Sequence, residues 1–500
     1  MEGSRWETAA MKECVSCRRD LEDAARFCDR CGRLQPQPEA KPAVRVRAVD
    51  AQSLNKARVL NAPSWLVVLI VSMVVNLFYW GLLPYGPRIF DPFTHVATLW
   101  DPGFYQTVAF EYSKLAVENH VFPYTAALPG YPFTTLEYPF LAGYLFYAIY
   151  AVAAGAFTTY VSIIQSINVA AEIGNVVLVY LIAKRFVSDL RAVLLAVLYS
   201  LTPSMLFFTV SRYDAISAFF SLLAVAHFLS GRYKLASAWA GVGFLLRYYP
   251  AILIIFFIKH GLSNRLGKKY LRDVIMIPAL LSALTLVPLL LLSPSAIPRE
   301  FLFSANFGWN WESVWGPIDR FVRFGIPSLA FFYDNQIWMR IAFAATILLS
   351  VLLLRVKNKL DVVAAYAFTI ICWLNTAWLF SPQYAMWIYP LLVAMSRTKK
   401  FLALTLGFGA LMTLELPSPF FYVFPVTQFY LVVGVSALRV LTLWALALLL
   451  LLWIRRAMGA ATAAPEPTRV TGRIEKLISQ TRVITRAANT SGAVNGRAEL

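Results

Sequence analysis

Two carboxylates stand out in a polar, aromatic segment that lies between apolar stretches of the chain. Asp101 follows Leu-Trp and precedes Pro-Gly-Phe-Tyr, and Glu137 directly precedes a Tyr-Pro pair where the next apolar run begins. Carboxylates beside membrane-like segments are costly to place and therefore tend to be functional. A carboxylate here can take the proton of an attacking hydroxyl. The pattern predicts Asp101 as the first candidate for a general base and Glu137 as the second.

Arginines near the same kind of boundary supply cations that can stabilise charge on a departing phosphate. Arg247 interrupts an apolar run just before Tyr-Tyr-Pro, and Arg212 precedes Tyr-Asp. Together with Arg88, these arginines are the candidates for that role. Two interpretations of Arg247 remain open: it binds a phosphate, or it extends to the membrane interface or pairs with a buried carboxylate.

Further polar residues form a second set of candidates. Gln383 and Tyr384 follow Ser-Pro, where they can bind a phosphate or an acceptor hydroxyl, or simply cap a short helix. Asp91 and Asp214 are additional carboxylates, although Asp91 can instead belong to a turn before proline. A group of tryptophans can stack on sugar rings or form an interfacial aromatic belt: Trp309, Trp311 and Trp315.

Four cysteines near the N-terminus have the spacing of a metal site. They form two C-x-x-C pairs separated by ten residues: Cys14, Cys17, Cys28 and Cys31. Four thiolates suit a tetrahedral structural Zn²⁺. Two disulfides or a redox pair are the alternative, which a reducing cytoplasm disfavours. The sequence predicts a structural zinc ribbon without a catalytic role, able to dock a protein partner.

The whole chain is too apolar for a water-soluble globule. Of its 500 residues 59% are hydrophobic and 14% charged, and its mean hydropathy is +0.61. Soluble domains carry about 25% charged residues. The net charge of +18 fits basic cytoplasmic loops and contact with anionic membrane lipids. No basic stripe with interleaved aromatics indicates nucleic-acid binding.

We therefore predict an all-α, polytopic transmembrane helix bundle of about twelve spans. The predicted organisation is a cytoplasmic zinc ribbon (1–34), a linker (35–64), the transmembrane domain (65–455) and a basic, disordered cytoplasmic tail (456–500). Basic residues before the first span place both termini in the cytoplasm of a plasma-membrane protein, with external loops 84–138 and 293–336. The expected spans are about 65–83, 139–157, 161–183, 190–210, 214–231, 235–258, 274–293, 337–354, 362–380, 384–396, 401–416 and 427–454.

Strict alternation of these spans creates one conflict. It puts the basic pair Lys184 and Arg185 outside and Asp214 inside, against the positive-inside rule. If 139–157 is re-entrant or lies along the membrane surface, Asp214 moves to the outer face. Both arrangements stay open at this stage.

An ordered series of short motifs resembles the GT-C superfamily of membrane glycosyltransferases over about residues 65–455. The series comprises the segment around Asp101 and Tyr105, Phe122-Pro123-Tyr124, Glu137-Tyr138-Pro139, Arg212-Tyr213-Asp214, Gly241-x-Gly243 with Arg247-Tyr248-Tyr249-Pro250, and Ser381-Pro382-Gln383-Tyr384-x-x-Trp387-x-x-Pro390. Within the superfamily it is most similar to mannosyltransferase-like, glycosyltransferase family 87-like proteins.

The resemblance implies an inverting hexosyltransferase. The donor would be a polyprenyl- or dolichyl-phosphate monosaccharide, often mannose, the acceptor a lipid or glycan at the outer face, and Asp101 the catalytic carboxylate. Departures include Arg247, where the family often has Lys, and Phe140, where it often has a second Pro. No Asp-x-Asp stands in the first external loop, which leaves the use of a divalent metal open. The alternatives are a secondary transporter, for which internal repeats and broken charged helices would be expected, and a lipid flippase or assembly subunit.

Overall fold

The computed structural model describes residues 11–13, 20–22, 63–82, 103–120, 124, 136, 138–298, 313–316, 318, 337–415 and 427–463. The chain divides into two compact units, Met1–Ala62 and Pro63–Leu500. In the first unit, β1 (Met11–Glu13) pairs antiparallel with β2 (Asp20–Glu22). The four cysteines of the predicted zinc ribbon, the predicted linker to residue 62 and the predicted tail beyond residue 463 lie outside the described residues.

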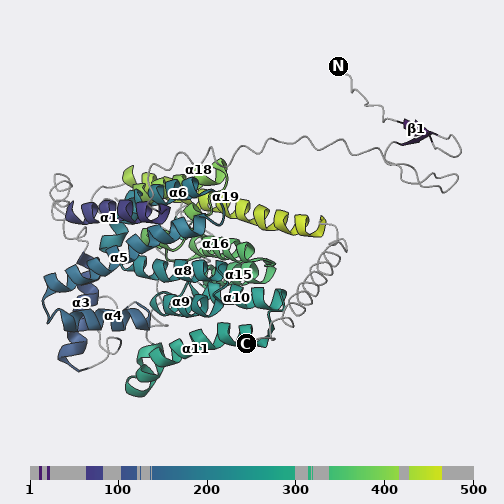
Figure 1. The fold of residues 1–500 in the computed structure, drawn as a ribbon. Helices are drawn as coiled ribbons and strands as arrows, with labels where there is room; N and C mark the ends of the chain where they lie inside the picture. Colours follow the sequence, from purple (N-terminus) through teal and green to yellow (C-terminus); the bar gives the residue numbers. More distant parts are fainter. Residues whose placement is uncertain are drawn as a thin grey trace, which may run out of the picture. The chain divides into compact units, whose positions relative to one another are not determined.

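The second unit is built from helices, as the apolar runs predict (Figure 1). Their bounds in chain order are α1 (Ser64–Leu82), α3 (Gly103–Glu118), α4 (Phe140–Val152), α5 (Phe157–Ala183), α6 (Asp189–Ser200), α7 (Pro203–Ser211), α8 (Asp214–Leu229), α9 (Tyr233–Leu246), α10 (Ala251–Ser263), α11 (Gly267–Leu292), α15 (Ile337–Leu353), α16 (Lys359–Thr376), the 3₁₀ helix η5 (Pro382–Trp387), α17 (Tyr389–Ala394), α18 (Lys399–Leu414) and α19 (Thr427–Ala463).

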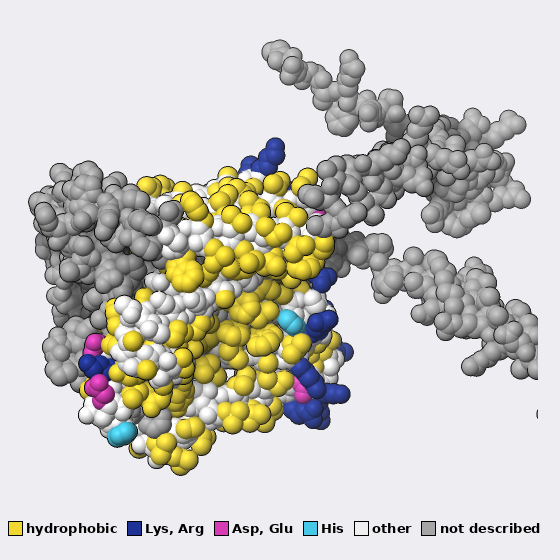
Figure 2. Space-filling model, turned by 60° about the vertical axis from the view of Figure 1, so that its left-hand side comes forward, with side chains coloured by type: hydrophobic (Ala, Val, Ile, Leu, Met, Phe, Trp, Pro, Cys, Tyr) yellow, Lys and Arg dark blue, Asp and Glu magenta, His cyan; other side chains and the backbone are white. Residues whose placement is uncertain are grey.

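Several of these helices have the length and apolarity of membrane spans. Among the described residues, four helices qualify on their own: α1, α5, α11 and the 434–455 part of α19. The pair α6 and α7, bent by 57°, qualifies as a fifth. Large side chains on α11 remain exposed, such as Leu284 at 66% and Leu291 at 76%. Hydrophobic side chains also cover most of the described face in Figure 2. An outer surface of this kind suits hydrocarbon rather than water.

Basic side chains gather at one end of the bundle, which we call the basic end (Lys184, Arg185, Lys259, Lys269 and Lys359). Contacts at this end tie together the C-terminal ends of α5, α8, α10 and α15 and the start of α16. These contacts are Arg185 to the Ser230 hydroxyl (3.2 Å), Lys359 to the Leu229 carbonyl (3.2 Å) and Lys259 to the Leu354 carbonyl (2.8 Å). Figure 2 shows most of the Lys and Arg side chains along one edge of the face. Such a concentration of Lys and Arg on one side is typical of membrane proteins.

The same contacts show where Asp214 lies relative to the basic end. Helix α8 starts at Asp214 and reaches the basic end at Leu229, whose carbonyl accepts the hydrogen bond from Lys359. Sixteen residues at about 1.5 Å each separate the two ends by about 24 Å. Lys184 and Asp214 are therefore at opposite ends of the bundle, as both arrangements left open by the sequence require.

Two of the expected spans differ from the helices observed. The span predicted at 139–157 is α4, which covers only Phe140–Val152. Its length of about 20 Å falls short of a hydrocarbon core of about 30 Å. The span predicted at 235–258 is two helices, because α9 ends at Leu246 and α10 begins only at Ala251. Pro250 favours such a break, since proline restricts the residue before it and offers no N–H.

Proline also shapes two other predicted spans. The region predicted at 190–210 is the bent pair α6 and α7, and α7 begins at Pro203. The region predicted at 384–396 is the short helix η5 followed by α17, with Pro390 in the first turn of α17. The other expected spans agree with single helices to within a few residues, apart from the span predicted at 274–293, whose helix α11 begins at Gly267, and the last span, whose helix α19 extends to Ala463.

A buried ion pair fastens α18 to α19. Nη1 of Arg439 lies 3.0 Å from Oε2 of Glu415, and the two side chains are 1% and 3% exposed. The guanidinium also lies 3.5 Å from the ring centroid of Phe380. Removing one member of such a pair leaves an uncompensated buried charge, whereas replacing both often costs little.

We therefore expect Glu415→Gln to destabilise the protein by about 3–5 kcal/mol. The double variant Glu415→Gln/Arg439→Met should recover most of that loss. Denaturant unfolding in detergent measures both variants. A single variant as stable as the wild type would show that this pair does not hold α18 and α19 together.

Candidate functional site

The break between α9 and α10 positions a cation inside the bundle. Arg247 has an extended backbone (φ −152°, ψ 144°), and its N–H donates to the carbonyl of Gly243 at 2.9 Å. A Cβ added at Gly243 would lie 3.2 Å from the Pro250 ring, so the close packing of the break favours glycine. Arg247 therefore turns out of the α9 helix just before the next helix begins.

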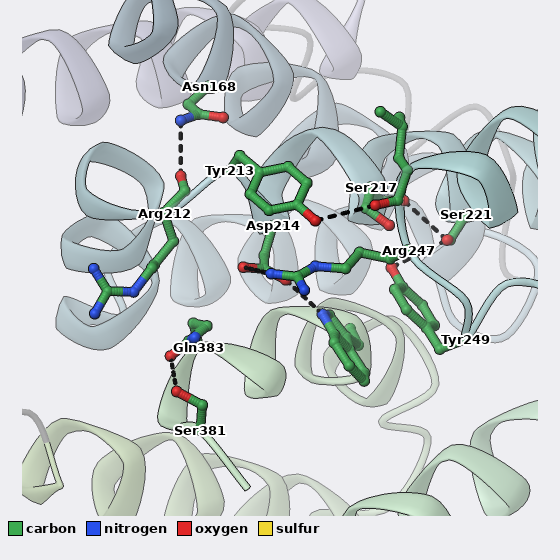
Figure 3. A network of polar contacts seen from close by, with 12 residues as sticks. Asn168, Arg212, Tyr213, Asp214, Ser217, Ser221, Arg247, Tyr249, Ser381 and Gln383 are labelled. Carbon is green, nitrogen blue, oxygen red and sulfur yellow. Dashed lines mark hydrogen bonds and ion pairs between the residues drawn. The ribbon is translucent and has the colours of Figure 1, made fainter. Parts of the chain in front are cut away.

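The side chain of Arg247 meets Asp214, the first residue of α8. Nε lies 3.0 Å from Oδ1, and Nη2 donates to Oδ2 at 3.2 Å (Figure 3). The indole N–H of Trp387 also donates to Oδ1, at 2.8 Å. The Asp214 side chain is 0% exposed and that of Arg247 is 12% exposed. The pairing with a buried carboxylate, which the sequence left as one of two interpretations, is thus present in the structure.

Four aromatic rings lie close to the guanidinium. Its central carbon lies 4.4 Å from the ring centroid of Tyr213, 5.3 Å from Tyr138, and 6.0 Å from both Tyr384 and Trp387. Tyr384 stacks on Trp387 with centroids 4.1 Å apart. Rings placed this way stabilise a cation by about 0.5–2 kcal/mol each. They also restrict the orientations that Arg247 can adopt.

This arrangement leaves one edge of the guanidinium available. Asp214 occupies the edge formed by Nε and Nη2, whereas Nη1 makes no hydrogen bond to another residue in the described part of the chain. A guanidinium can bind anions bidentately along more than one edge. The pair can therefore hold Arg247 charged and oriented while its other edge receives an anionic oxygen.

Arg212 lies on the other side of Tyr213. Its Nη1 donates to the Ser211 carbonyl at 3.0 Å, and its own carbonyl accepts from Asn168 at 2.7 Å. In Figure 3 its side chain points away from Arg247. Arg212, Asn168 and Phe146 line a small cavity of about 10 Å³. The two arginines thus flank one tyrosine instead of converging on one point.

The segment η5 brings the two other predicted binding residues beside the ion pair. Gln383 is 4% exposed, and its Oε1 accepts a hydrogen bond from the Ser381 hydroxyl. Tyr384 contributes one of the rings around Arg247. Arg247, Asp214, Gln383 and Tyr384 come together, although they are far apart in the sequence.

The predicted residues of the first external loop lie outside the described residues: Arg88, Asp91, Asp101 and Glu137. The residue after Glu137, Tyr138, is described and contacts Arg247. Trp309 and Trp311 are also outside the described part, whereas Trp315 donates to the Thr376 carbonyl at 3.0 Å.

Sequence reasoning missed the aromatic surroundings of Arg247. Tyr213 and Trp387 are both in motifs that the sequence highlights, but neither was assigned a role. The sequence could have indicated both aromatic residues, because each lies within a few residues of a candidate polar side chain in an apolar region.

Comparisons with known proteins add a distant likeness. No family model matches the chain, and no curated protein matches it. Among solved structures, it is similar to the archaeal oligosaccharyltransferase AglB from Archaeoglobus fulgidus in complex with an inhibitory peptide and a dolichol-phosphate. That match has 15% identity and a TM-score of 0.38, and it covers 77% of this chain and 55% of that chain.

A second similar structure is the Archaeoglobus fulgidus oligosaccharyltransferase in complex with Zn and sulfate. It matches with 16% identity and a TM-score of 0.37, over 75% of this chain and 53% of that chain. This chain therefore spans about half the length of the solved structures it matches.

Proposed function

We propose that the chain is a membrane glycosyltransferase that moves a monosaccharide, mannose in the first instance, from a polyprenyl- or dolichyl-phosphate donor to a lipid or glycan acceptor. The observation that carries the proposal is Arg247, a cation fixed by Asp214 within the bundle, with one edge left for an anion. The phosphate of a lipid-linked sugar can reach Arg247 within the bundle, because the lipid tail that carries it lies in the bilayer.

The site faces the outer side of the plasma membrane in this proposal, and both termini are cytoplasmic. Support comes from the basic end, about 24 Å from Asp214 along α8. Acceptors at the outer face then reach the site without crossing the membrane.

The proposed reaction is a single displacement. An acceptor hydroxyl attacks the anomeric carbon, and the bond between this carbon and the phosphate oxygen breaks. Asp101 takes the hydroxyl proton, and Glu137, next to Tyr138 in the chain, is the alternative base. The lipid phosphate leaves with the bonding electrons and is stabilised by Arg247. Attack opposite the leaving phosphate inverts the anomeric centre.

Gln383 and Tyr384 orient the donor in this proposal. Both belong to η5, whose Trp387 donates to Asp214, so a shift of this segment would also change the ion pair. Amide and phenol groups can hydrogen-bond phosphate oxygens or sugar hydroxyls.

A donor panel tests the substrate class. Purified protein in lipid is given polyprenyl-phosphate mannose, glucose or N-acetylglucosamine together with a crude lipid and glycan extract. Mannose transfer with inversion, read by NMR of the product, supports the full proposal. Transfer from another sugar donor alone would support the proposed reaction and contradict mannose as the transferred sugar. The same assay with EDTA shows whether a divalent metal takes part.

A secondary transporter is the second candidate, and one set of observations favours it. Transporters use broken helices that carry charges near the centre of the membrane. The chain has the break between α9 and α10, and Glu172 within α5 is 1% exposed and accepts from Asn175 at 2.9 Å. Solute uptake driven by an ion gradient in proteoliposomes would support the transporter. A chain with neither activity would fit a flippase or assembly subunit.

The N-terminal cysteines are proposed to bind one structural zinc ion and to dock a protein partner. In the sequence, strands β1 and β2 lie on either side of residues 14–19, which contain the first C-x-x-C pair. A short antiparallel pair returns the chain on itself, as a four-thiolate site requires.

We expect elemental analysis of the purified chain to find about one zinc per molecule. Cys28→Ser should lose most of it, whereas Cys372→Ser, which alters a buried cysteine in α16, should retain it. Sugar transfer should persist in Cys28→Ser, because closed four-cysteine sites are structural. Full zinc content in Cys28→Ser would refute the ribbon.

A further inference from the structure

A second cavity lies at the basic end, where α9 and α11 begin. Its volume is about 500 Å³. The cavity is lined by Gly231, Arg232, Tyr233, Lys234, Leu235, Leu266, Lys269, Tyr270 and Asp273. Helix α9 runs from this cavity to the residue before Arg247, a length of about 21 Å. The cavity is therefore separate from the Arg247 site, and none of its lining residues belongs to that site.

The lining carries an excess of positive charge. Three basic residues, Arg232, Lys234 and Lys269, line the cavity together with one carboxylate, Asp273. That carboxylate already has two basic partners, Lys234 at 3.6 Å and Arg272 at 3.2 Å. The cavity thus offers cations to an anion without a carboxylate free to repel it.

The helix ends at the cavity also favour the binding of an anion. Helices α9 and α11 both start here, and neither has a side chain that caps its N-terminus. The first N–H groups of a helix carry partial positive charge. Two uncapped helix starts therefore reinforce the field of the basic side chains.

Part of the cavity lining is apolar and comes from Tyr233, Leu235, Leu266 and Tyr270. Tyr233 and Tyr270 meet edge to face with centroids 4.9 Å apart, and the Tyr270 hydroxyl donates to the Phe257 carbonyl at 2.9 Å. Leu235 is 43% exposed, and further along α11 Leu280 is 60% exposed. The cavity thus joins a lipid-facing surface to a cluster of cations.

We propose that this cavity binds the phosphate-bearing headgroup of an anionic phospholipid in the cytoplasmic leaflet. Basic cavities between membrane helices on that side suit such headgroups. Arg232 and Lys269 contact the phosphate, and the leucines and tyrosines contact the glycerol and the first part of the acyl chains. A soluble phosphate shares the charge but gains nothing from the apolar lining.

Native mass spectrometry of the purified full chain tests the proposal, with phosphatidylglycerol and phosphatidylcholine as probes. The wild type should retain phosphatidylglycerol preferentially. Arg232→Gln/Lys269→Gln should reduce that retention on the order of tenfold. Lys268→Gln is the matched control, because Lys268 is adjacent, basic and exposed but does not line the cavity. Melting temperature in detergent confirms that both variants fold.

Three outcomes would overturn the proposal. Unchanged retention in the folded double variant would show that the cavity is not the lipid site. An equal loss in Lys268→Gln would show that surface charge alone attracts the lipid. Displacement of the lipid by glycerol phosphate at equal concentration would assign the cavity to a soluble phosphate instead.

Discussion

Arg247→Gln is expected to reduce kcat/KM for sugar transfer by about 10²–10³-fold, the range for losing one preorganised charge-stabilising group. The guanidinium of Arg247 is proposed to hold the departing phosphate with the edge that Asp214 leaves open. Glutamine retains a hydrogen-bond donor but removes the charge. Transfer of radiolabelled sugar by purified variants in lipid measures the loss.

The substitution has a second consequence that must be separated from the first. It leaves Asp214, which is 0% exposed, without its cation. Loss of one partner of a buried pair costs about 3–5 kcal/mol of stability. The double variant Asp214→Asn/Arg247→Gln removes both charges, so it should fold better than the single variant and remain inactive. Recovery of activity in the double variant would show that Arg247 serves the fold alone.

Asp101→Asn is expected to reduce transfer by about 10²–10⁴-fold, the usual contribution of a general base. Asparagine has nearly the same shape as aspartate but cannot accept the acceptor's proton. Stability should stay close to that of the wild type.

Asp91→Asn is the matched control, because it changes a carboxylate in the same external segment. It should remain active. If Asp101→Asn were fully active and Glu137→Gln inactive, the general base would be Glu137 and not Asp101. If all three variants were active, neither Asp101 nor Glu137 would act as the base.

The helical membrane architecture could be predicted from the sequence because it depends on local composition. Long apolar runs such as the one in α11 predict helices wherever they occur, since lipid cannot satisfy an unpaired backbone. The break at Arg247 could not be predicted in this way. The run from 235 to 258 is apolar on both sides of the arginine, and the break is stabilised by contacts with α8 and η5.

The candidate site, too, could be predicted from the sequence only in part. Gln383, Tyr384, Arg247 and Asp214 were each selected from the sequence by residue type. Their convergence depends on which helices are neighbours, and no spacing between residues 214, 247 and 384 encodes that. The shortness of α4, whose 13 residues are too few to cross a membrane, also required the structure.

The most direct test of the central claim follows both products of the reaction in one experiment. Wild-type protein in lipid receives polyprenyl-phosphate mannose labelled in the sugar, with the lipid and glycan extract as acceptor. The account predicts that labelled product and free polyprenyl phosphate appear in equal amounts, and that Arg247→Gln forms both at rates reduced by about 10²–10³-fold. Uptake of solute without release of polyprenyl phosphate would contradict it and favour the transporter.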